Sequence, residues 1–272
     1  MRRYQENESY AALGLRGKHV VTIGGGTGPF AVLSSLKHYP CMITAIVTMA
    51  DSGGSSRRLM DEFGQLPFGD LRQALVALSR NGVLWRDVFT FRFGKNGKQT
   101  RSVDPLAAST PGQELAKIAN AANAAGTGAP TPVKAQSVGE QAGVSGHSLG
   151  NLIISALQDL NGGNLLHAIA DAQELLNTAG AVLPVTLTQT TLCAELTDGE
   201  VICSETEIDT RGKQRSGSLV PIKRIFLQNP TPPCDEALRA IRRADVIIIG
   251  PGDLYTSILP NLLVDGVAEA IR

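Results

Sequence analysis

Three glycine-rich segments, each directly after a short apolar run, carry the residue types most suited to binding an anion. They are Gly24 to Gly28, Asp51 to Ser56 and Gly250 to Asp253. Glycine turns and helix N-termini expose backbone N–H groups that donate to phosphate oxygens. If the apolar runs are parallel strands, the three segments share the crevice at the carboxyl ends of those strands, where open α/β sheets bind ligands. The pattern predicts one site for an anionic ligand and favours a nucleotide.

The first segment partly matches a dinucleotide-binding loop. Gly26 to Ala31 fits G-x-G-x-x-G/A, and Asp51 follows 20 residues later, where such folds place a ribose-binding acid. This match alone favours an NAD-dependent oxidoreductase. No Lys-Ser/Thr pair follows the glycines, which excludes a Walker A loop. A tight strand–helix turn that binds no ligand is the structural alternative.

The second segment is not explained by a dinucleotide site. Ser52, Gly53, Gly54 and Ser55 form a loop rich in donors, and Arg57 and Arg58 follow Ser56. Such a loop suits a phosphate or a diphosphate, which leaves Asp51 for a sugar hydroxyl, a metal ion or a proton transfer. An ordinary surface loop is the alternative.

The third segment and a histidine-containing turn complete the candidate site. Gly250 and Gly252 could line a base or phosphate pocket, with Tyr255 either stacking on the ligand or packing in the core. Gly146 to Asn151 opens a further helix. Its His147 could be an acid–base group, an anion ligand or a packed polar residue.

Composition narrows the class of protein. The chain has 272 residues, enough for one large or two modest domains, and 25 basic residues balance 25 acidic ones. A net charge of zero argues against a general nucleic-acid or anionic-membrane binder. No apolar stretch approaches the roughly 20 residues of a membrane span. The start lacks an apolar signal region, and the four cysteines form no CxxC pair, so we expect a reducing cytoplasm rather than a disulfide framework or a zinc site.

Hydrophobic periodicity predicts the elements that position these residues. Asp70 opens a helix, where Asp70 and Gln73 approximate a capping box and Leu71, Ala74, Leu75 and Leu78 share one face. Asp198-Gly199 predicts a hairpin turn. The predicted strands are His19–Ile23, Ile43–Met49, Thr191–Leu196, Val201–Ser204, Leu219–Leu227 and a buried parallel Asp245–Ile249. The other predicted helices are Phe30–Lys37, Leu152–Leu160, Leu165–Leu176, Glu236–Arg243 and one from about Asp265 to the end.

These elements predict an α/β fold with a Rossmann-like, doubly wound, mostly parallel sheet and a β-hairpin excursion. Residues 94–145 are rich in Ala, Gly, Thr, Pro and Gln, and we interpret them as a flexible, low-complexity insertion with one helix near 113–125. Residues 1–18 form a polar N-terminal extension. We expect residues 1–272 to form a single domain.

Four long segments together resemble one family. VVTIGGGTGPFAVLSSLK, ITAIVTMADSGGSSRRLMDEFGQLPFGDLRQALVALS, GHSLGNLIISAL and ADVIIIGPGDLYTSILPNLLVDGVAEAI are similar to the YvcK-type gluconeogenesis factors of the CofD-like superfamily, which is named after 2-phospho-L-lactate transferase. The resemblance covers nearly all of the chain apart from the extension and the insertion.

The resemblance implies a Rossmann-like, usually dimeric, cytoplasmic protein. It implies binding of a nucleotide sugar, UDP-N-acetylglucosamine, and a role in cell shape and cell-wall synthesis during gluconeogenic growth. The transferase branch instead moves a phospholactyl group from a guanosine diphosphate donor to a deazaflavin alcohol with Mg²⁺. In that alternative Asp51 would be the catalytic group or the metal ligand.

The shared motifs imply a set of ligand-binding residues. They are Gly24, Gly25, Gly26, Thr27, Gly28, Ser52, Gly53, Gly54, Ser55, Asp70, Arg72, His147, Asn151, Gly250, Gly252 and Tyr255. This chain departs from the family at Arg57, where glycine is more usual, at Gln73, where asparagine is, and in its longer insertion. Relatives continue for roughly one more βα unit, which raises the hypothesis that this C-terminal unit is missing here.

The two leading hypotheses differ at residue 52. A binding regulator without turnover is favoured by Ser52, because the transferase branch typically has a second acid there. An enzyme of the transferase type would instead use Arg72 and the glycine loops to bind phosphates.

Overall fold

The fold is built on a sheet of four parallel strands. The computed structural model describes residues 14–25, 28–50, 67–92, 147–214 and 220–272. The strands are β1 (His19–Gly24), β2 (Met42–Val47), β3 (Ala181–Pro184) and β7 (Val246–Ile249), in the spatial order β3-β2-β1-β7. All three pairings are parallel. The predicted strands at 19–23, 43–49 and 245–249 are therefore confirmed.

Strand β7 is less buried than the sequence predicts. In the described part of the chain it pairs only with β1, so it lies at one edge of the sheet. Its first three residues are half-buried, and Ile249 is 44% exposed. An unbroken apolar run is typical of a strand covered on both faces, but it carries no information about position within the sheet.

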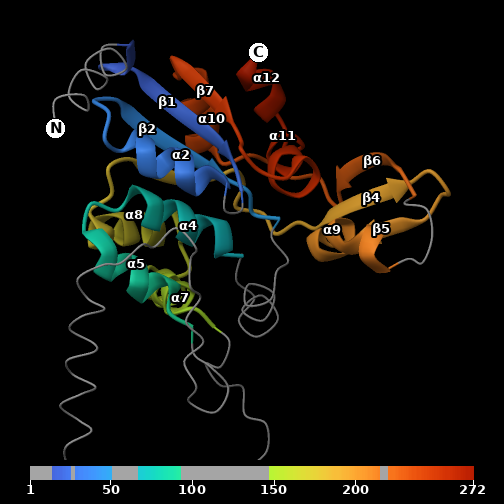
Figure 1. The fold of residues 1–272 in the computed structure, drawn as a ribbon, viewed down its shortest axis with the longest axis horizontal. Coiled ribbons are helices and arrows are strands. Elements are labelled where there is room, and N and C mark those ends of the chain that lie inside the picture. The colour runs from blue at the N-terminus through green and yellow to red at the C-terminus, as the bar shows by residue number, and fades with distance from the viewer. Residues whose placement is uncertain (1–13, 26–27, 51–66, 93–146, 215–219) are drawn as a thin grey trace, which may run out of the picture.

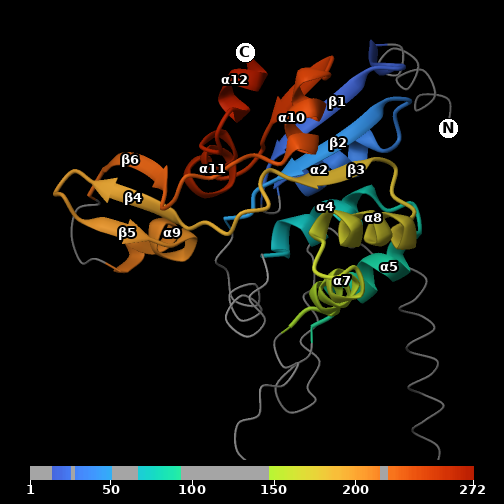
Figure 2. The ribbon, with the colours of Figure 1, turned by 180° about the vertical axis from the view of Figure 1, so that it is seen from behind.

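Helices cover both faces of this sheet, which makes it doubly wound (Figures 1 and 2). Alternate residues of a strand point to opposite faces. Val20 of β1 accordingly packs with α2, α4, α7 and α8, whereas Val21 and Ile23 pack with α10 and α12. The first layer holds α2 (Gly28–Leu36), α4 (Gly69–Leu78), α5 (Gly82–Thr90), α7 (Leu149–Leu160) and α8 (Leu165–Leu176). The second layer holds α10 (Asp235–Arg242), α11 (Leu259–Leu262) and α12 (Val267–Ile271).

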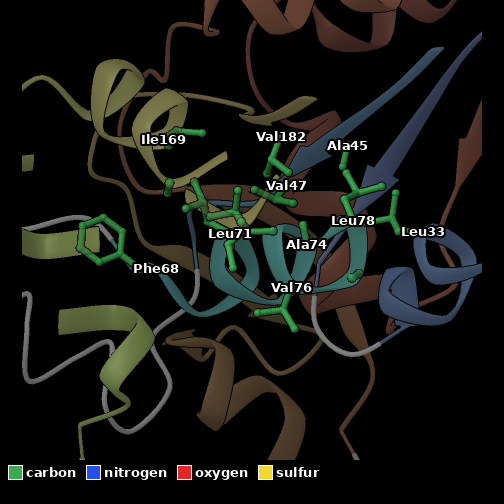
Figure 3. Close-up of a cluster of buried hydrophobic side chains, with 14 of the residues drawn as sticks. Leu33, Ala45, Val47, Phe68, Leu71, Ala74, Val76, Leu78, Ile169 and Val182 are labelled. Atoms are coloured by element: carbon green, nitrogen blue, oxygen red, sulfur yellow. The ribbon is translucent and has the colours of Figure 1, made fainter. Parts of the chain in front are cut away.

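Helix α4 occupies the centre of the larger core. Its residues Leu71, Ala74, Leu75 and Leu78 are buried, as predicted, and Figure 3 shows several of them beside Phe68 and the strand residues Val47 and Val182. The capping-box prediction is wrong. The helix begins at Gly69, so Asp70 lies inside the first turn, buried against the β1 loop, and no side chain caps the helix.

A second, antiparallel sheet lies beside the end of the first (Figure 1). Strands β4 (Leu192–Leu196), β5 (Val201–Cys203) and β6 (Ile222–Leu227) pair in the order β5-β4-β6. The predicted hairpin is confirmed, with Gly199 at φ +90° in its turn. Helix α9 (Glu205–Gln214) covers this sheet, and its Ile208 is fully buried.

One disulfide corrects the expectation from the cysteines. Cys193 and Cys203 are directly opposite each other in the β4–β5 ladder, and their sulfurs are bonded. Counting cysteines and searching for CxxC could not find this pair, because the hairpin register brings together residues that are ten apart. Cys41 and Cys234 are free thiols.

Within the described residues, no helix is long and apolar enough to cross a membrane. The predicted helix near 113–125 and the insertion itself lie outside the described residues. The remaining predicted helices are present, each within two or three residues of its predicted ends.

Candidate functional site

The β1 and β7 loops meet where the strand order reverses. From β1 the chain proceeds through α2 to β2 on one side, while β7 lies on the other side. The backbone N–H of Gly250 donates to the carbonyl of Ile23 at 2.8 Å, and a Cβ on Gly252 would lie 3.3 Å from the carbonyl oxygen of Gly25. Such a topological switch point is the usual ligand crevice of an open parallel sheet. The first and third glycine segments therefore lie together, as predicted.

The approach of these loops explains part of the glycine signal without a ligand. A Cβ on Gly28 would overlap the carbonyl of Pro251, and a Cβ on Gly24 would lie 3.0 Å from the ring of Pro29. Gly250 has a φ of +85°, which favours glycine. The glycines allow two loops to approach closely, and the helix α2 that begins at Gly28 keeps its first N–H groups at the crevice.

Asp70 brings a carboxylate to the same place. A Cβ on Gly25 would collide with the Asp70 carboxylate and with the methyl group of Thr48, so Gly25 lies against both side chains. Asp70 is only 8% exposed and lies in the first turn of α4, where the helix dipole favours a negative charge. A carboxylate beside an anion-binding loop suits a hydroxyl donor or a bridging cation.

A second cluster is centred on Arg72. Its Nε donates to Oδ1 of Asn151 at 3.0 Å, and its Nη1 donates to the Phe89 carbonyl at 3.4 Å. Asn151 is held in turn by Ser148, whose Oγ accepts the Asn151 backbone N–H at 3.3 Å and caps α7. Arg72, Asn151 and the neighbouring His147 are all at least 90% buried. This cluster fixes a guanidinium at the first turn of α4, the same turn that carries Asp70.

Gly150 shows how closely this cluster is packed. A Cβ there would lie 2.6 Å from the Phe89 carbonyl oxygen and 2.7 Å from Cδ of Arg72. Helices α4, α5 and α7 can meet around the guanidinium only if residue 150 has no side chain. The structure thus brings Arg72 and Asn151 together at one end of these helices, while His147 is buried directly before Ser148, the cap of α7.

Tyr255 is placed differently from the other site residues. It is half-buried and packs against the apolar cluster of the second sheet. Its backbone N–H donates to Oδ1 of Asp253 at 2.9 Å, as does that of Thr256 at 3.2 Å. Asp253 thereby begins η2 (Leu254–Ile258), a π-helical turn. Tyr255 was predicted either to stack on the ligand or to pack in the core, and its contact with this cluster favours packing in the core.

Several predicted site residues lie outside the described residues. These are Gly26, Thr27, Asp51, Ser52, Gly53, Gly54 and Ser55. Ala50, which directly precedes this second loop, is buried between the two sheets. Among the described residues, no three His, Cys, Asp or Glu side chains gather closely enough to hold a metal ion. Asp70 is the described carboxylate that could join a metal held mainly by ligand phosphates.

Sequence reasoning missed two buried threonines at the carboxyl ends of strands. Thr48 follows β2 and contacts Gly25, and its Oγ1 accepts the Ala50 N–H at 3.2 Å. Thr186 follows β3, and its Oγ1 donates to the Pro232 carbonyl at 2.6 Å. The search for glycine-rich segments could not find them, because Thr48 lies inside the predicted strand 43–49 and no strand was predicted before Thr186.

Comparisons with known proteins show the family to which the chain belongs. The family model described as "2-phospho-L-lactate transferase CofD" matches residues 20–272. A gluconeogenesis factor of Halalkalibacterium halodurans is 39% identical over 259 residues, which are 95% of this chain and 64% of that protein. The gluconeogenesis factor of Bacillus subtilis is 38% identical over 253 residues, 93% of this chain and 63% of that one. The chain thus spans a little under two thirds of the length of these relatives.

Solved structures show the same fold. A crystal structure of a UPF0052 family member from Bacillus halodurans has a TM-score of 0.71 and 38% sequence identity, covering 95% of this chain and 66% of that one. A second crystal structure of a Bacillus halodurans protein has a TM-score of 0.70 at the same identity.

Proposed function

The chain belongs to the CofD family, and from this premise we propose that it binds a nucleotide sugar of the UDP-N-acetylglucosamine type. The observation that carries the proposal is the contact between the β1 and β7 glycine loops, with the Asp70 carboxylate against Gly25. A diphosphate needs N–H donors and close backbone approach, whereas the sugar hydroxyls need an acceptor. The crevice offers backbone N–H donors at the glycine loops and an acceptor at Asp70, which lies against Gly25.

The proposed arrangement assigns a part of the ligand to each group. The diphosphate lies over Gly24, Gly25 and the N-terminus of α2. Asp70 accepts hydrogen bonds from hydroxyls of the sugar. The buried Arg72 adds positive charge at the same end of α4, held in place by Asn151. The Ser52–Ser55 loop, which lies outside the described residues, would supply further donors.

The names of the relatives support a regulatory role. The curated relatives are called gluconeogenesis factors. We therefore propose that ligand binding by this protein serves growth on gluconeogenic carbon sources, with cell shape and cell-wall synthesis as its output, in a cytoplasmic homodimer. Ser52 in place of a second acid supports binding without turnover.

Calorimetry with UDP-N-acetylglucosamine tests binding directly. We expect saturable heat and a raised Tm, since a ligand that binds only the native state stabilises it. Asp70→Asn keeps the shape but removes the carboxylate charge and should weaken binding of the sugar nucleotide more than that of UDP. Gly14→Ala is the matched control, because a Cβ there would meet no atom within 4 Å. No heat and no Tm shift at millimolar ligand would exclude the proposal.

A transferase of the CofD type is the second candidate. The name of the matching family favours it, as does a carboxylate beside the phosphate loops. The acceptor hydroxyl would attack the donor phosphorus and release guanosine monophosphate, and its proton would pass to Asp51 or to solvent. Mg²⁺ would neutralise the phosphates. Incubation with the guanosine diphosphate donor, the deazaflavin alcohol and Mg²⁺ should then release guanosine monophosphate, and no release would exclude turnover of this kind.

A further inference from the structure

The disulfide of the second sheet is open to solvent on one side. Cys193 lies in the central strand β4 and is 1% exposed, whereas Cys203, the last residue of β5, is exposed. The ladder between these strands contains three residue pairs, and the cysteines form one of them. Because Cys203 is the exposed partner and Cys193 the buried one, we expect a thiol in solution to attack the bond at Cys203.

The disulfide also fixes the beginning of α9. Cys203 is followed by Ser204, whose Oγ accepts the backbone N–H of Glu207 at 3.0 Å in the first turn of the helix. Because β5 is an edge strand of only three residues, the covalent bond is a major link between the start of α9 and β4.

Helix α9 touches the third glycine segment. Asp209 accepts a hydrogen bond from Oγ1 of Thr256 at 3.1 Å. The backbone of Thr256 is in turn bound to Asp253, directly after Gly252. A displacement of α9 therefore acts on the segment that forms one wall of the crevice.

The same helix also supports the approach to the second glycine segment. Ile208 is fully buried in a cluster with Leu192 and Ala194 of β4 and with Ala50. Ala50 is the last described residue before Asp51. This small cluster thus packs against both the β2 and the β7 sides of the crevice.

We propose that the Cys193–Cys203 disulfide is a redox switch that sets the ligand affinity of the crevice. The inference about affinity rests on the proposed function. A dithiol reductant attacks the exposed sulfur of Cys203, and Cys193 leaves as a thiolate that takes up a proton. The second thiol of the reductant then displaces Cys203, so one disulfide and one dithiol become two cysteine thiols and one oxidised reductant. Exposed disulfides are commonly the labile and regulatory ones.

Oxidation is the high-affinity state. With the disulfide intact, α9 is held on β4, and Asp209 holds Thr256 in place. After reduction this covalent link is lost and α9 is held on β4 less firmly, so the crevice must be ordered again when ligand binds. We expect the Kd for UDP-N-acetylglucosamine to rise three- to tenfold on reduction.

Hydrogen exchange on the ligand-free full chain tests the coupling without any ligand. The thiol state is set with dithiothreitol or oxidised glutathione and verified by maleimide labelling and mass spectrometry. Reduction should accelerate exchange in α9 and in residues 254–258, and leave α8 unchanged. If the cysteines cannot be oxidised, or if exchange at 254–258 is the same in both states, the switch is excluded.

Variants separate the steps of the switch. Cys203→Ser should behave as the reduced protein under all conditions, whereas Cys41→Ser, which removes a free thiol, should keep the redox response. Thr256→Val removes the hydroxyl and keeps the shape. It should abolish the redox response at 254–258 while that of α9 persists. A redox response at 254–258 that survives in Thr256→Val would exclude the Asp209 contact as the link.

Calorimetry in the two thiol states then separates the two proposals. No binding in either state contradicts the nucleotide-sugar function, and hydrogen exchange still decides whether the disulfide acts on the loop. Equal binding in both states supports that function and excludes the switch.

Discussion

The two sheets differ in how many apolar side chains they bury. The parallel sheet lies between two layers of helices and has two large clusters of buried residues. The antiparallel sheet is covered by α9, and among the described residues its cluster holds four buried side chains, Ala50, Leu192, Ala194 and Ile208. A core that small seldom stabilises a structure alone.

The second sheet compensates with links between side chains. It has the Cys193–Cys203 disulfide, and Glu195 forms ion pairs with Lys223 and Arg224 at 2.6 and 2.5 Å. The parallel sheet and its helices, in contrast, have close contacts at Gly25, Gly28 and Gly150, where a Cβ would collide with neighbouring atoms. The β1–β7 loop contact therefore belongs to the sheet with the larger core, whereas the second sheet depends more on links between side chains.

The largest effect should come from the core of the parallel sheet. Phe68 is fully buried beside α4 (Figure 3), and Phe68→Ala should cost about 3 to 5 kcal/mol of unfolding free energy because a large cavity remains. Urea unfolding followed by circular dichroism measures this cost. Leu84→Ala is the control, since Leu84 is 72% exposed and its loss should change stability by less than about 0.5 kcal/mol. Equal costs for the two variants would contradict the assigned core.

The matching change in the second sheet should be smaller and local. Ile208→Ala empties the centre of its cluster and should cost about 2 to 4 kcal/mol, but only in the opening of this sheet. Hydrogen exchange should rise in β4 and β6 while α8 keeps its protection. Equal loss of protection in both sheets would show that the two form one cooperative unit and would remove the contrast between them.

A change in the polar cluster at Arg72 should have the third largest effect on stability. Asn151→Ala leaves the buried guanidinium without one acceptor, at a cost of about 1 to 3 kcal/mol. Thermal unfolding measures the change, and Asn229→Ala, at an exposed position, is the control. If Asn151→Ala is as stable as the control, Asn151 does not hold Arg72 in place.

The sequence was sufficient for elements with strong local signals. The apolar runs before the three glycine-rich segments predicted β1, β2 and β7, and Asp198-Gly199 predicted the hairpin, because turn chemistry and hydrophobic period are local properties. The fourth parallel strand, β3, was not predicted, since its run of four residues carries no such turn signal. The capping box failed because Asp70 is used in a tertiary contact with Gly25. The prediction that β7 is buried was wrong because contacts along the whole chain decide the order of the strands.

The candidate site was less accessible to such reasoning. Arg72 and Asn151 are 79 residues apart in sequence and meet only because α4 and α7 pack together. Asp70 and Arg72 were identified as site residues by resemblance, since neither their spacing nor their type distinguishes them from surface charges. Cys193 and Cys203 face each other because of a ladder register that residue counting does not provide.

The smallest expected effect is a difference between the two sheets in how their stability depends on pH. Hydrogen bonds from Lys223 and Arg224 hold the pKa of Glu195 below its ordinary value, and the N–H of His19, with Lys18, does the same for the pKa of Asp245 at β7. A carboxylate with a lowered folded pKa stabilises the fold above its unfolded pKa, and this contribution is lost as the pH falls through the folded value.

A fall in pH below the ordinary carboxylate pKa should therefore destabilise the second sheet by protonating Glu195 and the parallel sheet by protonating Asp245. Hydrogen exchange measured at successive pH values, corrected for intrinsic rates, should show this loss in β4 and β6 for Glu195 and in β1 and β7 for Asp245. Glu195→Gln should flatten the response of the second sheet alone, and Asp245→Asn that of the parallel sheet alone. Both effects should shrink in high salt because the groups are near the surface. Since the second sheet has the smaller apolar cluster, its response should be the larger. A larger response in the parallel sheet would contradict the view that the second sheet depends more on links between side chains.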